Sequence, residues 1–215
     1  MLFTAGELPG LGPQAGHFLF CVSRIDVTIF GNVFVADSEN HTIRKISPTG
    51  SVSVFAGSPG IAGSNNGIGM NARFSSPKGI AILQNSTGSD PTGTLYVADT
   101  GNHVIRKITP TGVVMTLSGS AGVSGSTNGA RDLARFSSPE GVAVVSNGFV
   151  YVADTGNHTI RQITPAGTAD IYAGAAGQIG NTNATSSSAR FNSPRGIVLD
   201  TSTNVFVADT GNHTI

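Results

Sequence analysis

The sequence is poor in charge. Only 11% of its 215 residues are Asp, Glu, Lys or Arg, and the 12 basic residues balance the 12 acidic ones. Soluble domains usually carry about 25% charged residues, so the solubility of this chain must depend on Ser, Thr, Asn and Gly. Nucleic-acid binding through phosphates normally requires a basic excess, which this sequence lacks. The composition therefore argues against a nucleic-acid-binding protein.

Cysteine and long apolar runs are also scarce. The single cysteine, Cys21, excludes an intramolecular disulfide framework and a cysteine-rich zinc site. No run approaches the roughly 18 apolar residues of a membrane span, and the first ten residues lack the positive region of a signal peptide. Nothing in the sequence therefore specifies a cellular location, although a hydrophobic content of 39% is sufficient for a core.

Four copies of one motif dominate the sequence. They read VFVADSENHTI, LYVADTGNHVI, VYVADTGNHTI and VFVADTGNHTI, around Asp37, Asp99, Asp154 and Asp209. A repeat of this size cannot bury its own apolar surface, so the copies must stack on one another. The first interval is longer than the other two because it contains a polar insertion, residues 84–93, which we expect to form a surface loop.

Within each copy, turn signals separate four short β-rich runs. In the second copy these runs cover residues 79–83, 94–99, 103–108 and 113–118. Each copy is therefore expected to form a four-stranded antiparallel meander. The second run, Leu95-Tyr96-Val97-Ala98, is apolar at consecutive positions, which predicts that protein covers both faces of this strand.

Four-stranded units that repeat along a chain, joined by Gly/Ser-rich connections, indicate an all-β protein of the β-propeller type. A parallel β-helix is a less favoured alternative, because its coils are shorter and contain no regular hairpins. Here Asp-Thr-Gly-Asn joins two strands as a four-residue hairpin loop. We expect Gly101, Gly156 and Gly211 to take the positive φ of this turn. Glu39 of the first copy is expected either to strain the turn or to give it another geometry.

The order of the motifs resembles that of a known repeat family. From Asn32 onward, Val-Ala-Asp is followed by Asn-His-(Thr/Val)-Ile, Arg-(Lys/Gln)-Ile, a Gly-Ser segment, Ala-Arg-Phe and Ser-Pro-x-Gly-Ile. This order is similar to the NHL repeat, although Thr-Ile or Val-Ile stands where the family name implies Leu. The resemblance implies a six-bladed propeller of four-stranded antiparallel blades that serves as a binding platform.

The sequence contains fewer repeats than the resemblance implies. We interpret residues 1–215 as a single NHL-type fragment, an incomplete arc of about four blades from a six-bladed parent whose missing blades would be its partners. Its units cover approximately residues 1–6 (partial), 20–57, 78–119, 140–174 and 195–215 (partial). Residues 16–30 are read as a degraded copy of the segment that begins Ala-Arg-Phe. An incomplete arc leaves an open edge on each side, which favours self-association.

The polar residues that recur in the copies have two interpretations. Asp and His of the hairpin would suit an acid–base or metal pair, or Asp, Asn and His would form the turn by bonding to local backbone. Occurrence in every copy favours the structural role, because one reaction needs only one site. Arg73, Arg135 and Arg190 of Ala-Arg-Phe would suit an anionic ligand, but the favoured expectation is that each bridges to an Asp or a carbonyl of an adjacent blade. The following Phe residues are expected to fill the seam between blades. The structural set comprises Asp37, Asp99, Asp154, Asp209, Asn102, His103, Asn157, His158, Arg73, Arg135 and Arg190.

One position differs between copies and is therefore a better candidate for binding. The residue between Pro and Gly is Lys78, Glu140 and Arg195 in successive copies. It directly precedes the first strand of each unit, which in propellers lies nearest the central channel. These three side chains are predicted to surround one mouth of the channel, where alternating charge would bind a polar ligand or partner or remain a solvated loop feature.

The leading functional hypothesis is a non-catalytic module that binds a protein, a peptide or a glycan through its loops and channel mouth. One alternative is part of a propeller enzyme, a lactone hydrolase or an amidating-type lyase, with a divalent metal in the channel. That site needs polar side chains on the inner strands, where only Asp200 qualifies. The other alternative, from the family resemblance, is the substrate-recognition propeller of a ubiquitin ligase. We assign no catalytic residue, cofactor or metal ligand. Asn85 and Asn183 head glycosylation sequons on loops.

Overall fold

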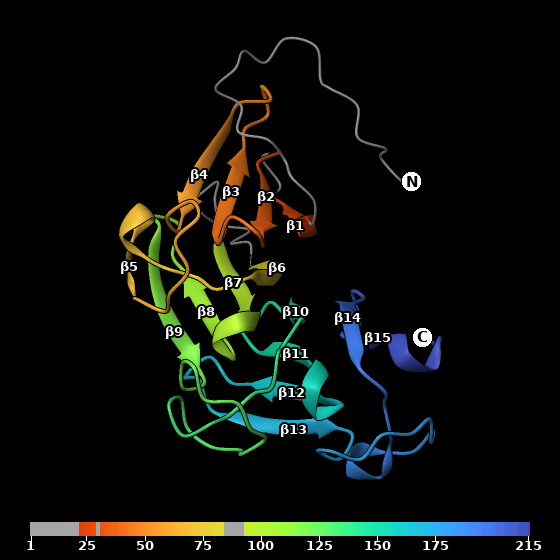
Figure 1. The fold of residues 1–215 in the computed structure, drawn as a ribbon. Helices are drawn as coiled ribbons and strands as arrows, with labels where there is room; N and C mark the ends of the chain where they lie inside the picture. Colours follow the sequence, from red (N-terminus) through yellow and green to blue (C-terminus); the bar gives the residue numbers. More distant parts are fainter. Residues whose placement is uncertain (1–21, 29–30, 84–92) are drawn as a thin grey trace.

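The computed structural model describes residues 22–28, 31–83 and 93–215, which form β-strands and short 3₁₀ helices (Figure 1). The strands form four antiparallel sheets that follow one another along the chain, named here blades 1 to 4. Blade 1 contains β1 (Val22–Val27), β2 (Val33–Asp37), β3 (Thr42–Ile46) and β4 (Val52–Ala56). Blade 2 contains β5 (Gly67–Ile68), β6 (Pro77–Leu83), β7 (Thr94–Asp99), β8 (Val104–Ile108) and β9 (Val113–Ser118).

Blades 3 and 4 complete the described chain. Blade 3 contains β10 (Gly141–Val144), β11 (Val150–Asp154), β12 (Thr159–Ile163) and β13 (Ala169–Ala173). Blade 4 contains β14 (Pro194–Leu199) and β15 (Val205–Asp209). The 3₁₀ helices are η1 (Gly69–Asn71), η2 (Thr100–Asn102), η3 (Thr155–Asn157), η4 (Ser186–Ser188) and η5 (Thr210–Asn212).

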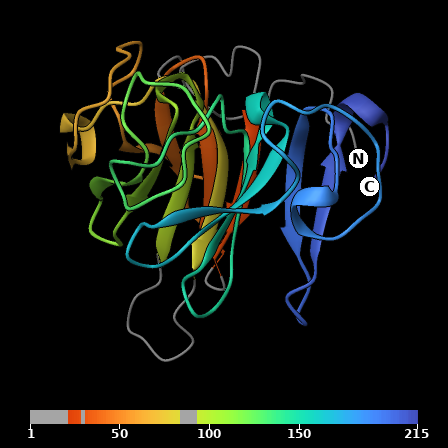
Figure 2. The same ribbon diagram turned by 90° about the horizontal axis from the view of Figure 1, so that it is seen from below.

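The blades are arranged as an arc around a common axis. The first full strands of neighbouring blades contact one another, β1 with β6, β6 with β10 and β10 with β14, while β4, β9 and β13 lie farther out (Figure 1). Figure 2 shows the arc from another side, with η3 and the β14–β15 turn at opposite edges of the sheets. The predicted all-β propeller of antiparallel four-stranded blades is therefore confirmed. Blade 2 differs in one respect, because the two-residue strand β5 pairs with β9 as a fifth strand.

The second strand of each inner blade is buried on both faces, as its consecutive apolar residues predict. In β7, Leu95 and Val97 belong to the core between blades 1 and 2. Tyr96 and Ala98 belong to the core between blades 2 and 3. Phe74, from the connection between blades 1 and 2, is fully buried in the first of these cores. Each seam is thus filled by alternating faces of neighbouring strands together with one phenylalanine from the connecting segment.

The hairpin turn departs from the prediction for glycine. His103 takes the left-handed conformation, with φ of 57°, and His41, His158 and His213 do the same. Gly101 lies inside η2, and its backbone N–H donates to the Ser75 carbonyl oxygen at 2.8 Å. A Cβ atom at position 101 would lie 2.8 Å from that oxygen, so the site needs glycine because of a close approach and not because of its φ. For the first copy, strain at Glu39 is not what the structure has, because Glu39 is exposed and His41 takes the positive φ. The expected alternative, another turn geometry, is present instead, since residues 38–41 form a turn without the 3₁₀ helix of the other copies.

Several predicted features lie outside the described residues. These are the partial unit at residues 1–6, Cys21, most of the degraded segment at residues 16–30, and residues 84–92 of the insertion, with Asn85. The ends of the insertion are described, because β6 pairs with β7 through Leu83 and Thr94. Within the described ranges, no helix is long and apolar enough to span a membrane.

Candidate functional site

A buried ion pair joins the end of β7 to β8 in blade 2. The Asp99 carboxylate accepts hydrogen bonds from the Ser75 backbone N–H at 2.7 Å, the Asn102 amide at 2.8 Å and Arg106 Nη1 at 2.8 Å. Both charged side chains are completely shielded from solvent. The pair therefore holds the segment that enters the blade against its second and third strands.

The arginine of this pair also binds the entering segment directly. Arg106 Nη1 donates to the Arg73 carbonyl oxygen at 3.0 Å, and Nη2 donates to the Asn65 carbonyl oxygen and to Asn66 Oδ1. The guanidinium lies over the Phe74 ring, 5.2 Å from its centroid. Four acceptors and an aromatic face compensate for the desolvation of the buried cation.

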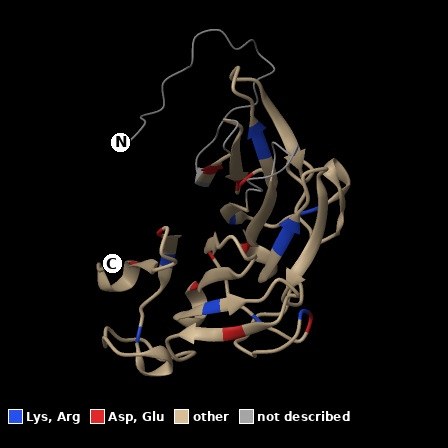
Figure 3. Ribbon diagram, turned by 180° about the vertical axis from the view of Figure 1, so that it is seen from behind, with Lys and Arg blue, Asp and Glu red and all other residues tan. Residues whose placement is uncertain are grey.

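Blade 3 repeats this arrangement, and blade 1 contains a weaker version. Asp154 accepts from Ser137, Asn157 and Arg161, and Arg161 lies over Phe136, 5.0 Å from the ring centroid. In blade 1 the Asp37–Arg44 distance is 3.5 Å, and Asn40 donates to both Asp37 oxygens. Figure 3 shows the basic residues on β3, β8 and β12, at matching places in successive blades.

Histidine and threonine of the hairpin connect each blade to the next. His103 Nδ1 accepts the Ser138 backbone N–H at 3.0 Å, and His41 and His158 accept from Ser76 and Ser193 in the same way. The Thr100 hydroxyl donates to the Pro139 carbonyl oxygen at 2.6 Å. An imidazole nitrogen that accepts a backbone N–H is not positioned as a metal ligand or a general base. These histidine and threonine residues therefore have the same structural role in each seam, which is to hold one blade to the next.

Burial changes the acidity of the two fully enclosed carboxyls. It raises the pKa of Asp99 to about 6, although Arg106, Asn102 and Ser75 each act to lower it. It likewise raises the pKa of Asp154 to about 6 against the opposing effects of Asn157, Ser137 and Arg161. Both groups carry their negative charge at neutral pH.

The loop arginines have shorter-range contacts than predicted. Arg73 Nη1 donates to the Met70 and Ala72 carbonyl oxygens, which belong to its own connecting segment. Arg135 and Arg190 bond in the same way to carbonyls of their own segments. The expected bridge to an Asp or an adjacent blade is wrong for these residues, and the strand arginines Arg106 and Arg161 make the contact to Asp instead. The sequence contains a signal for it, because an arginine follows Asp37, Asp99 and Asp154 by seven residues each time.

Lys78, Glu140 and Arg195 lie together at the start of the inner strands. Lys78 Nζ is 2.9 Å from Glu140 Oε1, and Arg195 Nη1 is 3.3 Å from Glu140 Oε2. The three residues belong to blades 2, 3 and 4, so one row of contacts crosses two seams. The Arg195 side chain is 54% exposed, whereas the Glu140 side chain is 14% exposed. We name this row the mouth cluster.

Apart from Asp26, the residues that line the channel behind the mouth cluster are aliphatic. A cavity of about 320 Å³ is lined by the inner strands, with residues such as Ile80, Val142 and Ile197. Asp26 of β1 lines it as well and accepts the Ile82 backbone N–H at 2.9 Å, a contact hidden from sequence reasoning because Asp26 lies in the degraded segment. Asp200 lies in the exposed turn after β14 and accepts hydrogen bonds from Ser202 and Asn204, so the turn and not the channel uses its carboxylate.

The electrostatics of Asp200 fit this local role. Hydrogen bonds from the Asn204 side chain and backbone hold the pKa of the Asp200 carboxyl below its ordinary value. Among the residues that the structure describes, no group of three or more His, Cys, Asp or Glu side chains could hold a metal ion.

Comparisons with known proteins agree with this architecture. A model of the NHL repeat matches residues 136–163 and 191–215. The protein SUPPRESSOR OF QUENCHING 1, chloroplastic, of Arabidopsis thaliana is 34% identical over 139 residues, which are 60% of this chain and 12% of that protein. NHL repeat-containing protein 2 of Bos taurus is 35% identical over 138 residues, again 60% of this chain and 18% of the relative. The chain therefore spans less than a fifth of the length of either relative.

Solved structures share the fold at lower identity. An auxiliary nutrient binding protein from Bacteroides thetaiotaomicron has a TM-score of 0.64 at 20% identity, over 86% of this chain and 44% of that one. A streptogramin B lyase has a TM-score of 0.54 at 16% identity, over 86% and 47% of the two chains. The blades and their common channel define a β-propeller. Two segments of the chain match the NHL repeat, and one of its relatives is an NHL repeat-containing protein.

Proposed function

We propose that this chain is a non-catalytic NHL-repeat binding module that contacts a protein or peptide partner through its loops and the mouth cluster. The observation that carries the proposal is the contrast between the two kinds of polar residue. Asp99, Asn102 and His103 have equivalents that make the same contacts in other blades, whereas the mouth cluster changes charge from blade to blade. A scaffold that repeats does not dictate such a change.

The charges of the mouth cluster favour an acidic partner. Glu140 is shared by Lys78 and Arg195, so the cluster carries one net positive charge. The exposed Arg195 guanidinium presents a planar set of donors that suits a carboxylate. The ligand class that this geometry fits best is a polypeptide segment with Asp or Glu side chains.

The enzyme alternative receives no specific support from the described residues. A channel-bound metal needs several oxygen or nitrogen ligands, and the described channel wall contributes Asp26, which bonds to backbone. Likeness to a streptogramin B lyase at 16% identity concerns the fold alone. We expect no metal-dependent turnover when the purified chain is assayed on a lactone panel, and turnover that a chelator abolishes would contradict the proposal.

The binding proposal is tested by charge reversal at the mouth. Arg195→Glu and Lys78→Glu should each weaken binding of a fluorescent Glu-rich peptide by about tenfold, because each places a negative charge beside Glu140. Lys45→Glu, on β3 away from the mouth, reverses the same charge and serves as the control. Peptide affinity is measured by fluorescence anisotropy at two salt concentrations. Equal affinity of the three variants and the parent chain would contradict the proposal.

A further inference from the structure

A tight turn recurs in the loop that follows the outer strand of blades 1, 2 and 3. It covers residues 58–61, 120–123 and 175–178, and in each case the backbone N–H of the last residue donates to the carbonyl oxygen of the first. The third residue is a glycine with φ of 74°, 77° or 73°: Gly60, Gly122 and Gly177. A positive φ at this position fits a type II turn. We name these three turns the seam turns.

Each seam turn bridges the hairpins of two neighbouring blades. The Gly122 N–H donates to the Asn102 carbonyl oxygen of blade 2 at 3.0 Å, and the Gly125 carbonyl oxygen accepts the Asn157 amide of blade 3 at 2.6 Å. The other two seam turns are held by the same pair of contacts: Gly60 to Asn40 and Gly63 to Asn102, and Gly177 to Asn157 and Gly180 to Asn212. The frame of the turn is therefore the same at the three seams between the described blades.

One hairpin separates each seam turn from a residue of the mouth cluster. Pro139, which precedes Glu140, accepts the Thr100 hydroxyl at 2.6 Å, and Asn102, two residues after Thr100, holds Gly122. The same contacts lead from the other two mouth residues to their seam turns: Lys78 through Pro77, Ser38 and Asn40 to Gly60, and Arg195 through Pro194, Thr155 and Asn157 to Gly177. The mouth cluster, the hairpins and the seam turns therefore follow one another outward on one face of the arc.

The last residue of each seam turn is exposed and differs between blades. It is Ile61, Val123 and Gln178 in succession, and the isoleucine and the valine are 52% and 47% exposed. The hairpin residues Thr100 and Asn102, which lie between the two rows, are buried and recur in blade 3. On this face an inner and an outer row thus vary, while the row between them repeats. The contrast that supports binding at the mouth cluster applies equally to the seam turns.

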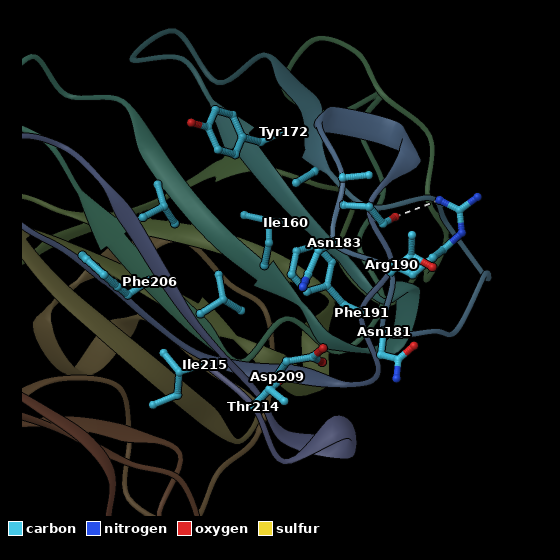
Figure 4. Close-up of a pocket in the computed structure, with 16 residues that line it drawn as sticks. Ile160, Tyr172, Asn181, Asn183, Arg190, Phe191, Phe206, Asp209, Thr214 and Ile215 are labelled. Carbon is cyan, nitrogen blue, oxygen red and sulfur yellow. Dashed lines mark hydrogen bonds between the residues drawn. The ribbon is translucent and has the colours of Figure 1, made fainter.

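The groove between blade 3 and β15 is a separate feature (Figure 4). Its volume is about 720 Å³, and its exposed apolar residues are Tyr172, Phe206 and Ile215, the last residue of the sequence. Their exposure therefore carries no information about a partner. Ile61, Val123 and Gln178 do not line this groove.

We propose that the seam turns select an apolar side chain within the acidic segment that the mouth cluster binds, an inference that rests on the proposed function. The carboxylates of the segment contact the mouth cluster, and a leucine or a similar side chain lies against Ile61 or Val123. Residues 57–66 and 119–130, which include these two turns, contain no charged residue. An apolar side chain can therefore be buried there without desolvating a charge. The partner is an extended polypeptide that combines Glu or Asp with Leu-like residues.

The test uses the full 215-residue chain and two fluorescent peptides, EELEELEELEE and EESEESEESEE, which differ in apolar content alone. Fluorescence anisotropy should show at least about tenfold tighter binding of the leucine peptide, because leucine is removed from water. Ile61→Ser and Val123→Ser should each weaken its binding about fivefold and leave the serine peptide unaffected. Gln178→Ile, which adds a third apolar turn, should strengthen it about threefold. Ile68→Ser removes an isoleucine of similar exposure from β5, at the outer edge of blade 2, and is the matched control without effect.

The serine peptide separates this inference from the proposed function. Arg195→Glu should weaken binding of both peptides, and a serine peptide that ignores this change would contradict the role of the mouth cluster. The role of the seam turns is overturned if the two peptides bind equally, if Ile61→Ser has no larger effect than Ile68→Ser, or if the leucine peptide fails to bind. It is overturned as well if a second copy of the chain covers the seam turns, seen by sedimentation as a dimer that Ile61→Ser abolishes.

Discussion

At the scale of the residue, the buried arginines Arg106 and Arg161 are single side chains on which the stability of the fold depends. Each is an ionised group without solvent contact, and each bonds to an aspartate of its own blade and to carbonyls of the connecting segment. Removing one partner of such a pair leaves an uncompensated buried charge, which costs far more than the loss of a surface ion pair. These side chains therefore determine whether the connecting segment stays attached to its blade.

Replacement of the buried cation tests this role. Arg106→Met keeps an apolar side chain under Phe74 but leaves Asp99 without its counter-ion, and we expect the free energy of unfolding to fall by about 3–5 kcal/mol. Lys107→Met, one residue away and partly exposed, should change it by less than about 0.5 kcal/mol. Urea unfolding followed by circular dichroism gives both values. Similar stabilities for the two variants would show that the ion pair is dispensable.

The buried carboxyls predict a specific pH dependence. The pKa values of Asp99 and Asp154 are raised to about 6 in the folded chain, whereas the ordinary value is 3.8. Between these pH values the folded chain binds more protons than the unfolded chain, so the contribution of both groups to stability is fully present below pH 3.8 and is lost as pH rises through 6. Carboxyl carbon NMR should place both titration midpoints near 6. Midpoints at or below 4 would contradict this prediction.

At the scale of the element, the hairpin turn shows what the sequence could and could not predict. The strands of the second copy were predicted within two residues of β6, β7, β8 and β9, because period and turn composition are local signals. The conformation of the turn was not predicted correctly. The position of the left-handed φ depends on the close approach of Ser75 to Gly101. Contacts of this kind, between segments distant in the sequence, cannot be predicted from local composition.

A substitution at the turn tests this explanation. Gly101→Ala places a Cβ atom against the Ser75 carbonyl, and we expect a loss of stability of about 1–3 kcal/mol from overpacking. Glu39→Ala, at the same position of blade 1, should be neutral because Glu39 is exposed. Thermal unfolding of the two variants is compared with that of the parent chain. A neutral Gly101→Ala would show that the approach of Ser75 is readily relaxed.

At the scale of the whole molecule, the repeats make the fold easy to predict from the sequence, whereas they make the functional residues harder to identify. The four motifs predicted stacked blades because one copy cannot bury its own core, and the buried faces of β7 and β11 are what this argument requires. Contacts between neighbouring blades could be predicted from the sequence only in part. The proximity of Lys78, Glu140 and Arg195 followed from strand order, but the shared role of Glu140 depends on side-chain positions that no sequence pattern specifies.

The central claim is that binding belongs to positions that vary between blades, and scaffolding to positions that repeat. An NMR titration of the isotopically labelled chain with a Glu-rich peptide tests it most directly, because every backbone amide reports separately. We expect saturable shift changes centred on Lys78, Glu140 and Arg195, with the amides of Asp99, Asn102 and His103 unaffected. Changes centred on the repeated Asp-Asn-His turns, with the mouth cluster silent, would contradict it.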